Sequence, residues 1–268
     1  MPPQQIYLAE FIDRYTHRTA KSKLLTQKYR SVMADPRVSE GFIPAIKELV
    51  YPIMGQRSQG CHFWDVDGNE YVDLTMGLGV NLFGHNPKFV QEAIATQLTK
   101  GIQIGPQSEL AGEVASLICE LTGVERVAFS NTGTEAVMAA IRLARAVTGR
   151  PKIAMFAGSY HGHFDGTLVK TIGEEQQSVP IAPGIPTTLA QETLVLPYDK
   201  PEALEQIKQH ASELAAVLVV PVQTTRPNLQ PQEFLHQLRL LTTECNIPLI
   251  FDEMVTGFRI HPGGAQAW

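Results

Sequence analysis

Two adjacent acids near the C-terminal end of the sequence could bind a cation. Asp252 and Glu253 directly follow the apolar run 248–251. Paired acids after a strand can hold Mg²⁺ in nucleotidases, but those proteins also need a G-x-x-x-x-G-K-[ST] phosphate loop. The nearest segment, GVNLFGHN at 79–86, has His85 where the lysine is required. The sequence therefore excludes a P-loop nucleotidase, and Asp252 needs another partner.

A phosphate site is predicted where a short apolar segment runs into a helix at 130–135. Thr132 and Glu135 have the spacing of a capping box, and Gly133 has no side chain to block an approaching ligand. The backbone N–H groups of Gly133 and Thr134 would point out of the helix N-terminus, where the helix dipole attracts anions. The plainer alternative is an ordinary capped helix.

A third segment, FAGSYHGHFDG at 156–166, places two planar side chains among glycines. Tyr160 and His161 could cover the face of an aromatic ligand. His161 and His163 could also bind a metal, but an H-x-H pair without nearby acids is a weak metal signal. The alternative is a glycine-rich loop whose rings simply pack together.

These segments follow strands predicted at 126–129, 153–156, 215–222 and 247–251, and helices are predicted at 133–148, 201–215 and 231–246. Apolar strands that alternate with helices indicate an α/β fold, with a mostly parallel sheet covered by helices on both faces. Ligands gather at the carboxyl ends of such strands. Residues 157–193, rich in Gly, Pro and Thr, are predicted to form one long loop. The helix at 133–148 is predicted to have a narrow apolar face of small residues, made of Ala136, Ala139, Ala140, Leu143 and Val147.

The first part of the chain is organised differently. A β-hairpin is predicted at 61–75 around the turn Asp67-Gly68-Asn69. Helices are predicted at 86–100, with Asn86 as N-cap, and at 108–123, ending at Gly123. We expect an N-terminal segment at 1–105, with a helical lead-in, the hairpin and a helix, followed by an incomplete ligand-binding domain at 106–268.

Composition narrows the classes of function. The net charge of −5 gives no basic surface for nucleic acid. No segment has the apolar length of a membrane helix, and residues 1–23 lack the apolar core of a signal peptide. Cys61, Cys119 and Cys245 are widely spaced, which predicts buried thiols in a reducing cytoplasm.

One ligand satisfies the three segments. It needs a phosphate at Gly133 and Thr134, an aromatic ring against Tyr160, and a cationic ring nitrogen beside Asp252. Pyridoxal 5′-phosphate (PLP) has these groups, and a carboxylate that keeps its ring nitrogen protonated makes the ring an electron sink.

A family resemblance points the same way. The motifs SNTGTEAVMAAIRLAR, GSYHGHFDG, PVQ and FDEMVTGFR resemble, in order and spacing, the class III aminotransferases of PLP fold type I. The segments LTMGLGVNLFGHNP, GIQIGPQSELAGEVA and TTRPNLQP are similar to aminotransferase domains of cyanobacterial hybrid polyketide/peptide synthetases. Glutamate-1-semialdehyde aminomutase shares the core motifs.

The resemblance implies a role for each matching residue. Gly133 and Thr134 would bind the phosphate, Tyr160 would stack on the pyridine ring, and Asp252 would pair with its nitrogen. Gln223 would bind the phenolic oxygen. Met254 stands where the family usually has Val, against the other ring face. Val220 replaces a usual Glu, which removes a polar contact near Gln223.

The family's Schiff-base lysine follows the stretch at 251–259, whereas the last lysine of this sequence is Lys208. We therefore expect the N-terminal part of an aminotransferase whose catalytic lysine lies beyond residue 268, and which is inactive alone. The resemblance implies a homodimer that moves an amino group from an amino-acid donor to a ketone or aldehyde, or to a carrier-bound β-ketoacyl acceptor. The alternatives are a glutamate-1-semialdehyde aminomutase-like enzyme and a non-catalytic binding or dimerisation module. Arg226 is expected at the surface, with a grip on a substrate carboxylate as the alternative.

Overall fold

The chain forms two compact units in a computed structural model that describes residues 3–34, 43–173 and 177–268. The first unit is Met1–Ile104 and the second is Gly105–Trp268. Among the described helices, none combines the length and the apolar character that crossing a bilayer requires.

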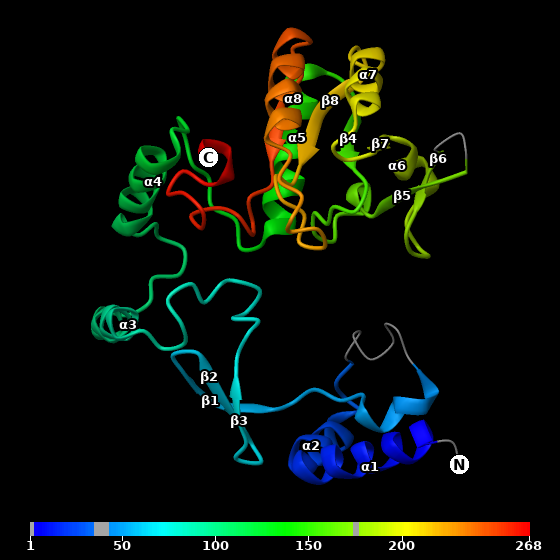
Figure 1. Cartoon of the computed structure of the whole chain (residues 1–268). Coiled ribbons are helices and arrows are strands. Elements are labelled where there is room, and N and C mark those ends of the chain that lie inside the picture. Colours follow the sequence, from blue (N-terminus) through cyan, green and yellow to red (C-terminus); the bar gives the residue numbers. More distant parts are fainter. Residues whose placement is uncertain (1–2, 35–42, 174–176) are drawn as a thin grey trace. The chain divides into compact units, whose positions relative to one another are not determined.

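The first unit combines helices with a small antiparallel sheet (Figure 1). The sheet order is β1-β2-β3, and β2 and β3 form the predicted hairpin, with Phe63 opposite Tyr71. The elements are α1 (Pro3–Arg18), α2 (Ala20–Tyr29), the 3₁₀ helix η2 (Pro44–Leu49), β1 (Gly55–Gln59), β2 (His62–Asp65), β3 (Glu70–Val72) and α3 (Lys88–Lys100). The helix predicted at 86–100, with Asn86 as N-cap, thus begins one residue later than predicted. Pro87 is its N-cap, because Asn86 adopts a left-handed backbone with φ of 53°.

Asp65 is the polar centre of the hairpin. Its carboxylate is buried and accepts hydrogen bonds from the backbone of Asp67 and Asn69, from the Asn69 side chain, and from Tyr71 Oη at 2.7 Å. Burial alone raises the pKa of this carboxyl, but the hydrogen bonds outweigh burial and leave its pKa below the ordinary value. Burial and the bond to Asp65 raise the pKa of Tyr71 to about 12.

The second unit contains a four-stranded parallel sheet of order β7-β4-β8-β9. A two-stranded antiparallel sheet, β5-β6, accompanies it. The elements are α4 (Glu109–Thr122), α5 (Gly133–Thr148), β4 (Lys152–Phe156), the 3₁₀ helix η3 (Asp165–Thr167), β5 (Val169–Ile172), β6 (Gln177–Pro180), α6 (Thr187–Gln191), β7 (Thr193–Leu196), α7 (Pro201–Gln209), β8 (Leu214–Val219), α8 (Gln232–Glu244), β9 (Leu249–Phe251) and the 3₁₀ helix η4 (Ala265–Ala267).

Helices cover both faces of the parallel sheet, as predicted. On one face, α7 and α8 contribute Ile207, Phe234 and Leu238 to a core that includes Phe156 of β4. On the other face, α5 packs through Val137, Ile141 and Ala144. Strand β8 is buried along its whole length because both faces are covered.

Four predictions about this unit are wrong in part. Residues 126–129 form no strand, because they pair with no neighbouring strand among the described residues, and Phe129 is exposed. The segment 157–193 is not one loop, since it contains β5, β6 and α6, although 174–176 lie outside the described residues. Helix α7 ends at Gln209 rather than 215, because Leu214 and Ala215 are buried in β8. The predicted small-residue face of α5 is also wrong, because Leu143 and Val147 are exposed.

Candidate functional site

The N-terminus of α5 has the capped geometry that the sequence predicted. Thr132 Oγ1 accepts a hydrogen bond from Glu135 N at 3.1 Å, and the Glu135 carboxylate accepts one from Thr132 N at 3.1 Å. The same carboxylate also accepts from Asn131 N at 2.8 Å. The helix therefore begins at Gly133, and the cap leaves the N–H groups of Gly133 and Thr134 free of these side-chain bonds.

The loop after β4 packs against this helix N-terminus. The backbone N–H of His163 donates to Thr134 Oγ1 at 3.1 Å. Gly162 has a left-handed φ of +84°, and a Cβ at this position would collide with Thr134 Oγ1. Only glycine therefore allows this loop to lie so close to α5.

Met254 closes the other side of Gly133. A Cβ added to Gly133 would lie 2.8 Å from the Met254 sulfur. Met254 thus occupies the space that a side chain at position 133 would fill. Most of the Met254 side chain remains exposed, at 65%.

Asp252 is paired with a buried histidine. It lies just beyond β9, and its Oδ2 atom is 2.7 Å from His161 Nδ1. Only 6% of the Asp252 side chain and none of the His161 side chain is exposed. Met254 N donates to the second oxygen, Oδ1, at 3.2 Å. The carboxylate is therefore fixed in orientation, and His161 Nε2 is buried without a hydrogen-bond partner.

Gln223 is buried in the loop after β8, with its amide committed to neighbouring groups. Its Nε2 atom donates to Ala157 O and to Ser159 Oγ, each at 2.9 Å. Its Oε1 atom accepts from the guanidinium of Arg226, with Nε at 3.0 Å. Arg226 is exposed, as predicted, but it also orients Gln223. The loops after β4 and β8 are thus joined through one side chain.

Tyr160 remains open to solvent. Its side chain is 63% exposed, and its ring meets His163 edge-on with centroids 6.0 Å apart. No described aromatic ring stacks on its face. The ring is therefore available to a planar ligand.

The two adjacent acids have separate partners. Asp252 binds His161, whereas Glu253 accepts from Thr256 Oγ1 at 2.8 Å and from the backbone of Ala265 and Gln266 at 2.6 and 3.0 Å. They do not form a paired carboxylate. No group of three metal-binding side chains occurs in 3–34, 43–173 or 177–268.

A continuous series of contacts joins the predicted site residues. Thr134 contacts the loop 157–164, which is bonded both to Asp252 through His161 and to Gln223. Gly133 contacts Met254. The chemical types of these groups suit PLP. A helix N-terminus suits its phosphate, an exposed aromatic ring suits its pyridine ring, and a fixed carboxylate suits its ring nitrogen. The Gln223 amide fits less simply, since Ser159 must give up its bond before Gln223 can donate to a phenolic oxygen.

Sequence reasoning assigned His161 to a ligand face or a metal, and missed its bond to Asp252. One signal was available. His161 follows β4 and Asp252 follows β9, and both of these strands are neighbours of β8 in the sheet. A separate cavity of about 470 Å³ is lined by Glu253, Arg239, Leu235 and Trp268 among others, and by none of the six predicted cofactor residues.

The geometry defines an α/β protein in which a capped helix N-terminus and a fixed carboxylate belong to one network of contacts. The family model "Aminotransferase class-III" matches residues 44–264. The chain therefore belongs to the class III aminotransferase family, whose members are PLP-dependent enzymes of fold type I.

Relatives and solved structures agree with this assignment. The glutamate-1-semialdehyde 2,1-aminomutase of Chloroflexus aggregans is 44% identical over 220 residues, which are 81% of this chain and 50% of that protein. An omega-transaminase from Sphaerobacter thermophilus has a TM-score of 0.83 and 34% identity, over 92% of this chain and 57% of that one. A transaminase with PLP bound has a TM-score of 0.82 and 33% identity, over 93% and 58%. The chain spans about half the length of the curated relatives it matches.

Proposed function

We propose that residues 106–268 form the PLP-binding part of an aminotransferase. The observation that carries the proposal is the buried Asp252–His161 pair at the carboxyl end of the sheet, in one contact network with the N-terminus of α5. A buried carboxylate that is held in one orientation is suited to a cationic ring nitrogen, and a helix N-terminus is suited to a phosphate.

Each predicted residue has a task in this proposal. Gly133 and Thr134 receive the phosphate through their backbone N–H groups, and Tyr160 covers one face of the ring while Met254 faces the other. Asp252 holds the proton on the ring nitrogen, and His161 Nδ1 donates to Asp252 Oδ2 and fixes its direction. Gln223 binds the phenolic oxygen. When bound, PLP supplies an electron sink for the substrate's α-carbon.

The whole protein would move an amino group between an amino-acid donor and a keto acceptor. The lysine that shuttles protons in such a reaction follows the acidic motif in the family, and no lysine follows Asp252 within residues 1–268, where Lys208 is the last. More specifically, the proposed acceptor is a β-ketoacyl group bound to a carrier protein, and the proposed role is in secondary metabolite biosynthesis. Mass measurement of aminated acyl-carrier protein would test it. Aminomutase activity is the second candidate, because the relatives at 39–44% identity bear that name. Turnover of glutamate-1-semialdehyde without a separate keto acceptor would favour it.

The assembly and the location are also proposed. A homodimer is expected for the whole protein, and light scattering would detect it. A cytoplasmic location is supported by the three free cysteines, because a reducing compartment keeps thiols unpaired. Recovery of the protein from a secreted fraction would argue against it.

Cofactor titration of the chain 1–268 tests the proposal directly. We expect reversible PLP binding, and the absorbance of the bound ring measures it. Asp252→Ala should weaken binding about tenfold or more, since a charge-assisted hydrogen bond contributes roughly 1.5–3 kcal/mol. The matched control is Glu244→Ala, an exposed acid on α8, which should leave binding unchanged. Equal affinity of the wild type and Asp252→Ala would contradict the assigned site.

Borohydride reduction of the PLP-loaded chain tests where amines react. Low, scattered labelling of surface lysines such as Lys100 and Lys208 is expected, with negligible half-transamination by an amino donor. Peptide mapping by mass spectrometry gives the positions. Stoichiometric labelling of one lysine would show that a residue within 1–268 takes the catalytic role. A chain that binds no PLP at all would favour the non-catalytic module.

A further inference from the structure

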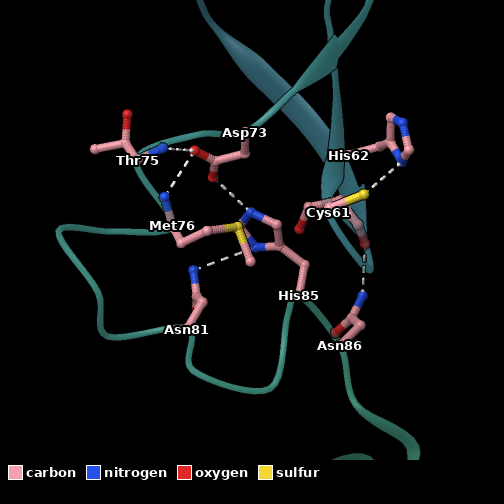
Figure 2. Close-up of polar contacts among 9 residues, drawn as sticks. Cys61, His62, Asp73, Thr75, Met76, Asn81, His85 and Asn86 are labelled. Carbon is pink, nitrogen blue, oxygen red and sulfur yellow. Dashed lines mark hydrogen bonds and ion pairs between the residues drawn. The ribbon is translucent and has the colours of Figure 1, made fainter. Parts of the chain in front are cut away.

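Cys61 is an exposed thiol beside a base, contrary to the buried thiols that the sequence predicted. It lies in the turn between β1 and β2, and its Sγ atom is 3.3 Å from His62 Nδ1 (Figure 2). Cys119 and Cys245 are only partly exposed, and neither has a described histidine contact. Tight turns usually contain Gly, Asn or Asp, so the geometry of the turn does not explain a cysteine at this position.

The second nitrogen of His62 faces a carboxylate. His62 Nε2 is 3.9 Å from Glu70 Oε1, on the neighbouring strand β3. This distance is too long for a hydrogen bond, but a nearby negative charge attracts an N–H at Nε2, and in that tautomer Nδ1 can accept from the thiol. A sulfur nucleophile, a base and a carboxylate near the base therefore follow one another in space.

The backbone holds Cys61 firmly. Gly60 and His85 exchange two backbone hydrogen bonds, at 2.9 and 2.8 Å, and Asp73 N donates to Cys61 O at 2.8 Å. His85 Nε2 in turn lies 2.8 Å from Asp73 Oδ2, and Figure 2 marks this contact with a dashed line. The turn that carries the thiol is thus fixed on both sides to the segment 73–85, which limits the conformations that Cys61 can adopt.

Close glycines make this arrangement possible. Gly60 has a φ of +56°, and a Cβ on Gly84 would lie 3.0 Å from Gly60 O. A larger residue at Gly60 would be strained by the left-handed backbone, and one at Gly84 would also crowd the Gly60 carbonyl. The thiol is therefore presented by a rigid support and not by a flexible tail.

We propose that Cys61 is a site of thiol–disulfide exchange with low-molecular-weight disulfides. His62 accepts the thiol proton, and the Cys61 thiolate attacks one sulfur of the disulfide. A new S–S bond forms as the original S–S bond breaks, and the leaving thiolate takes the proton from His62. Cys61 is oxidised to a mixed disulfide while half of the small disulfide is reduced to a thiol. Excess thiol reverses the step.

Reaction of the full chain with 4,4′-dithiodipyridine tests the proposal. Absorbance of the released thiopyridone gives the rate, and peptide mass mapping assigns it to a cysteine. At neutral pH, Cys61 should react about tenfold faster than Cys119 or Cys245. His62→Gln should slow Cys61 about tenfold, and Glu70→Gln should slow it about two- to threefold. Incubation with glutathione disulfide should give one mixed disulfide, at Cys61, that dithiothreitol removes.

The pH dependence separates base assistance from a structural effect. At about pH 10 an ordinary thiol is ionised, so the rates of wild type and His62→Gln should converge there. A difference that persists undiminished at that pH would show that His62 acts on the shape of the turn. Equal labelling of all three cysteines at neutral pH would overturn the proposal. Lys88→Gln, an exposed change at the start of α3, is the matched control and should leave the rate unchanged.

Discussion

The two units of this chain use different means of stabilisation. Among the described residues, every buried hydrophobic side chain lies between Val137 and Ile247, in the second unit. The buried residues of the first unit are Thr19, Ser22 and Asp65, all polar. The second unit is held by apolar burial on both faces of a sheet, and the first by hydrogen bonds that converge on a few side chains. The two units should therefore respond differently to loss of volume, loss of acceptors and acid.

The largest effect is expected in the parallel sheet. Leu218→Ala removes a fully buried side chain from β8 and should lower the free energy of unfolding of the second unit by about 3–5 kcal/mol. Denaturant unfolding, followed by far-UV circular dichroism, measures it. Leu240→Ala on α8 is the matched control, because Leu240 is 72% exposed. Equal losses in the two variants would contradict the assigned core.

The next effect lies at the candidate site. Gly162→Ala forces a left-handed residue and a contact with Thr134 Oγ1, and should cost about 2–3 kcal/mol. PLP affinity should fall with it, because the loop bearing Tyr160 and His161 moves away from α5. Combining it with Thr134→Ala should restore part of the stability, since the colliding oxygen is then absent. No gain in the double variant would show that backbone strain alone is responsible.

Loss of acceptors should affect the first unit. Asp65→Asn removes an oxygen that accepts from Asn69 Nδ2 and Tyr71 Oη, and should cost about 1–3 kcal/mol. Because the pKa of Asp65 in the folded chain lies below the unfolded value of about 3.9, this stabilisation is present above that pH and is lost as the pH falls through the folded pKa. Acid unfolding of the wild type should therefore lose the hairpin's near-UV signal in that window, and Asp65→Asn should lack this step. Asp13→Asn, at an exposed position in α1, should keep it.

The smallest effect concerns the cap of α5. Thr132→Ala removes the hydrogen bond to Glu135 N and should cost about 1 kcal/mol. Thr132→Ser retains the oxygen and should be close to wild type. Thermal unfolding of both variants under the same conditions measures the difference, and an equal loss in both would point to the methyl group instead.

Local signals in the sequence predicted local structure well. The capping box at Thr132 and Glu135, the hairpin turn at 67–69 and the glycine stop at 123 are each fixed by neighbours in sequence, and all are present. The covered parallel sheet followed from strands apolar on both faces.

Errors arose where pairing or packing decides the outcome. Strands β5 and β6 have four residues each and mix polar with apolar residues, with Lys170 opposite Val179 and Thr171 opposite Ser178, so hydrophobic periodicity does not reveal them. The buried side of α5 depends on which face meets β8, and both faces carry apolar residues. The Asp252–His161 bond joins positions 91 residues apart, and no local pattern specifies it. The assignment of the six residues to PLP stays a prediction.

Glu253 closes a loop through hydrogen bonds, next to Asp252, which is proposed to contact the cofactor. Its carboxylate holds the backbone N–H of Ala265, twelve residues further along the chain, and that of Gln266. Once these bonds form, the segment 253–265 behaves as a closed ring, and most of its loop-closure entropy has already been lost. Asp252 then stands at the junction of a strand and a small ring. The carboxylate that faces His161 is therefore one residue away from the ring that the first residue of η4 closes.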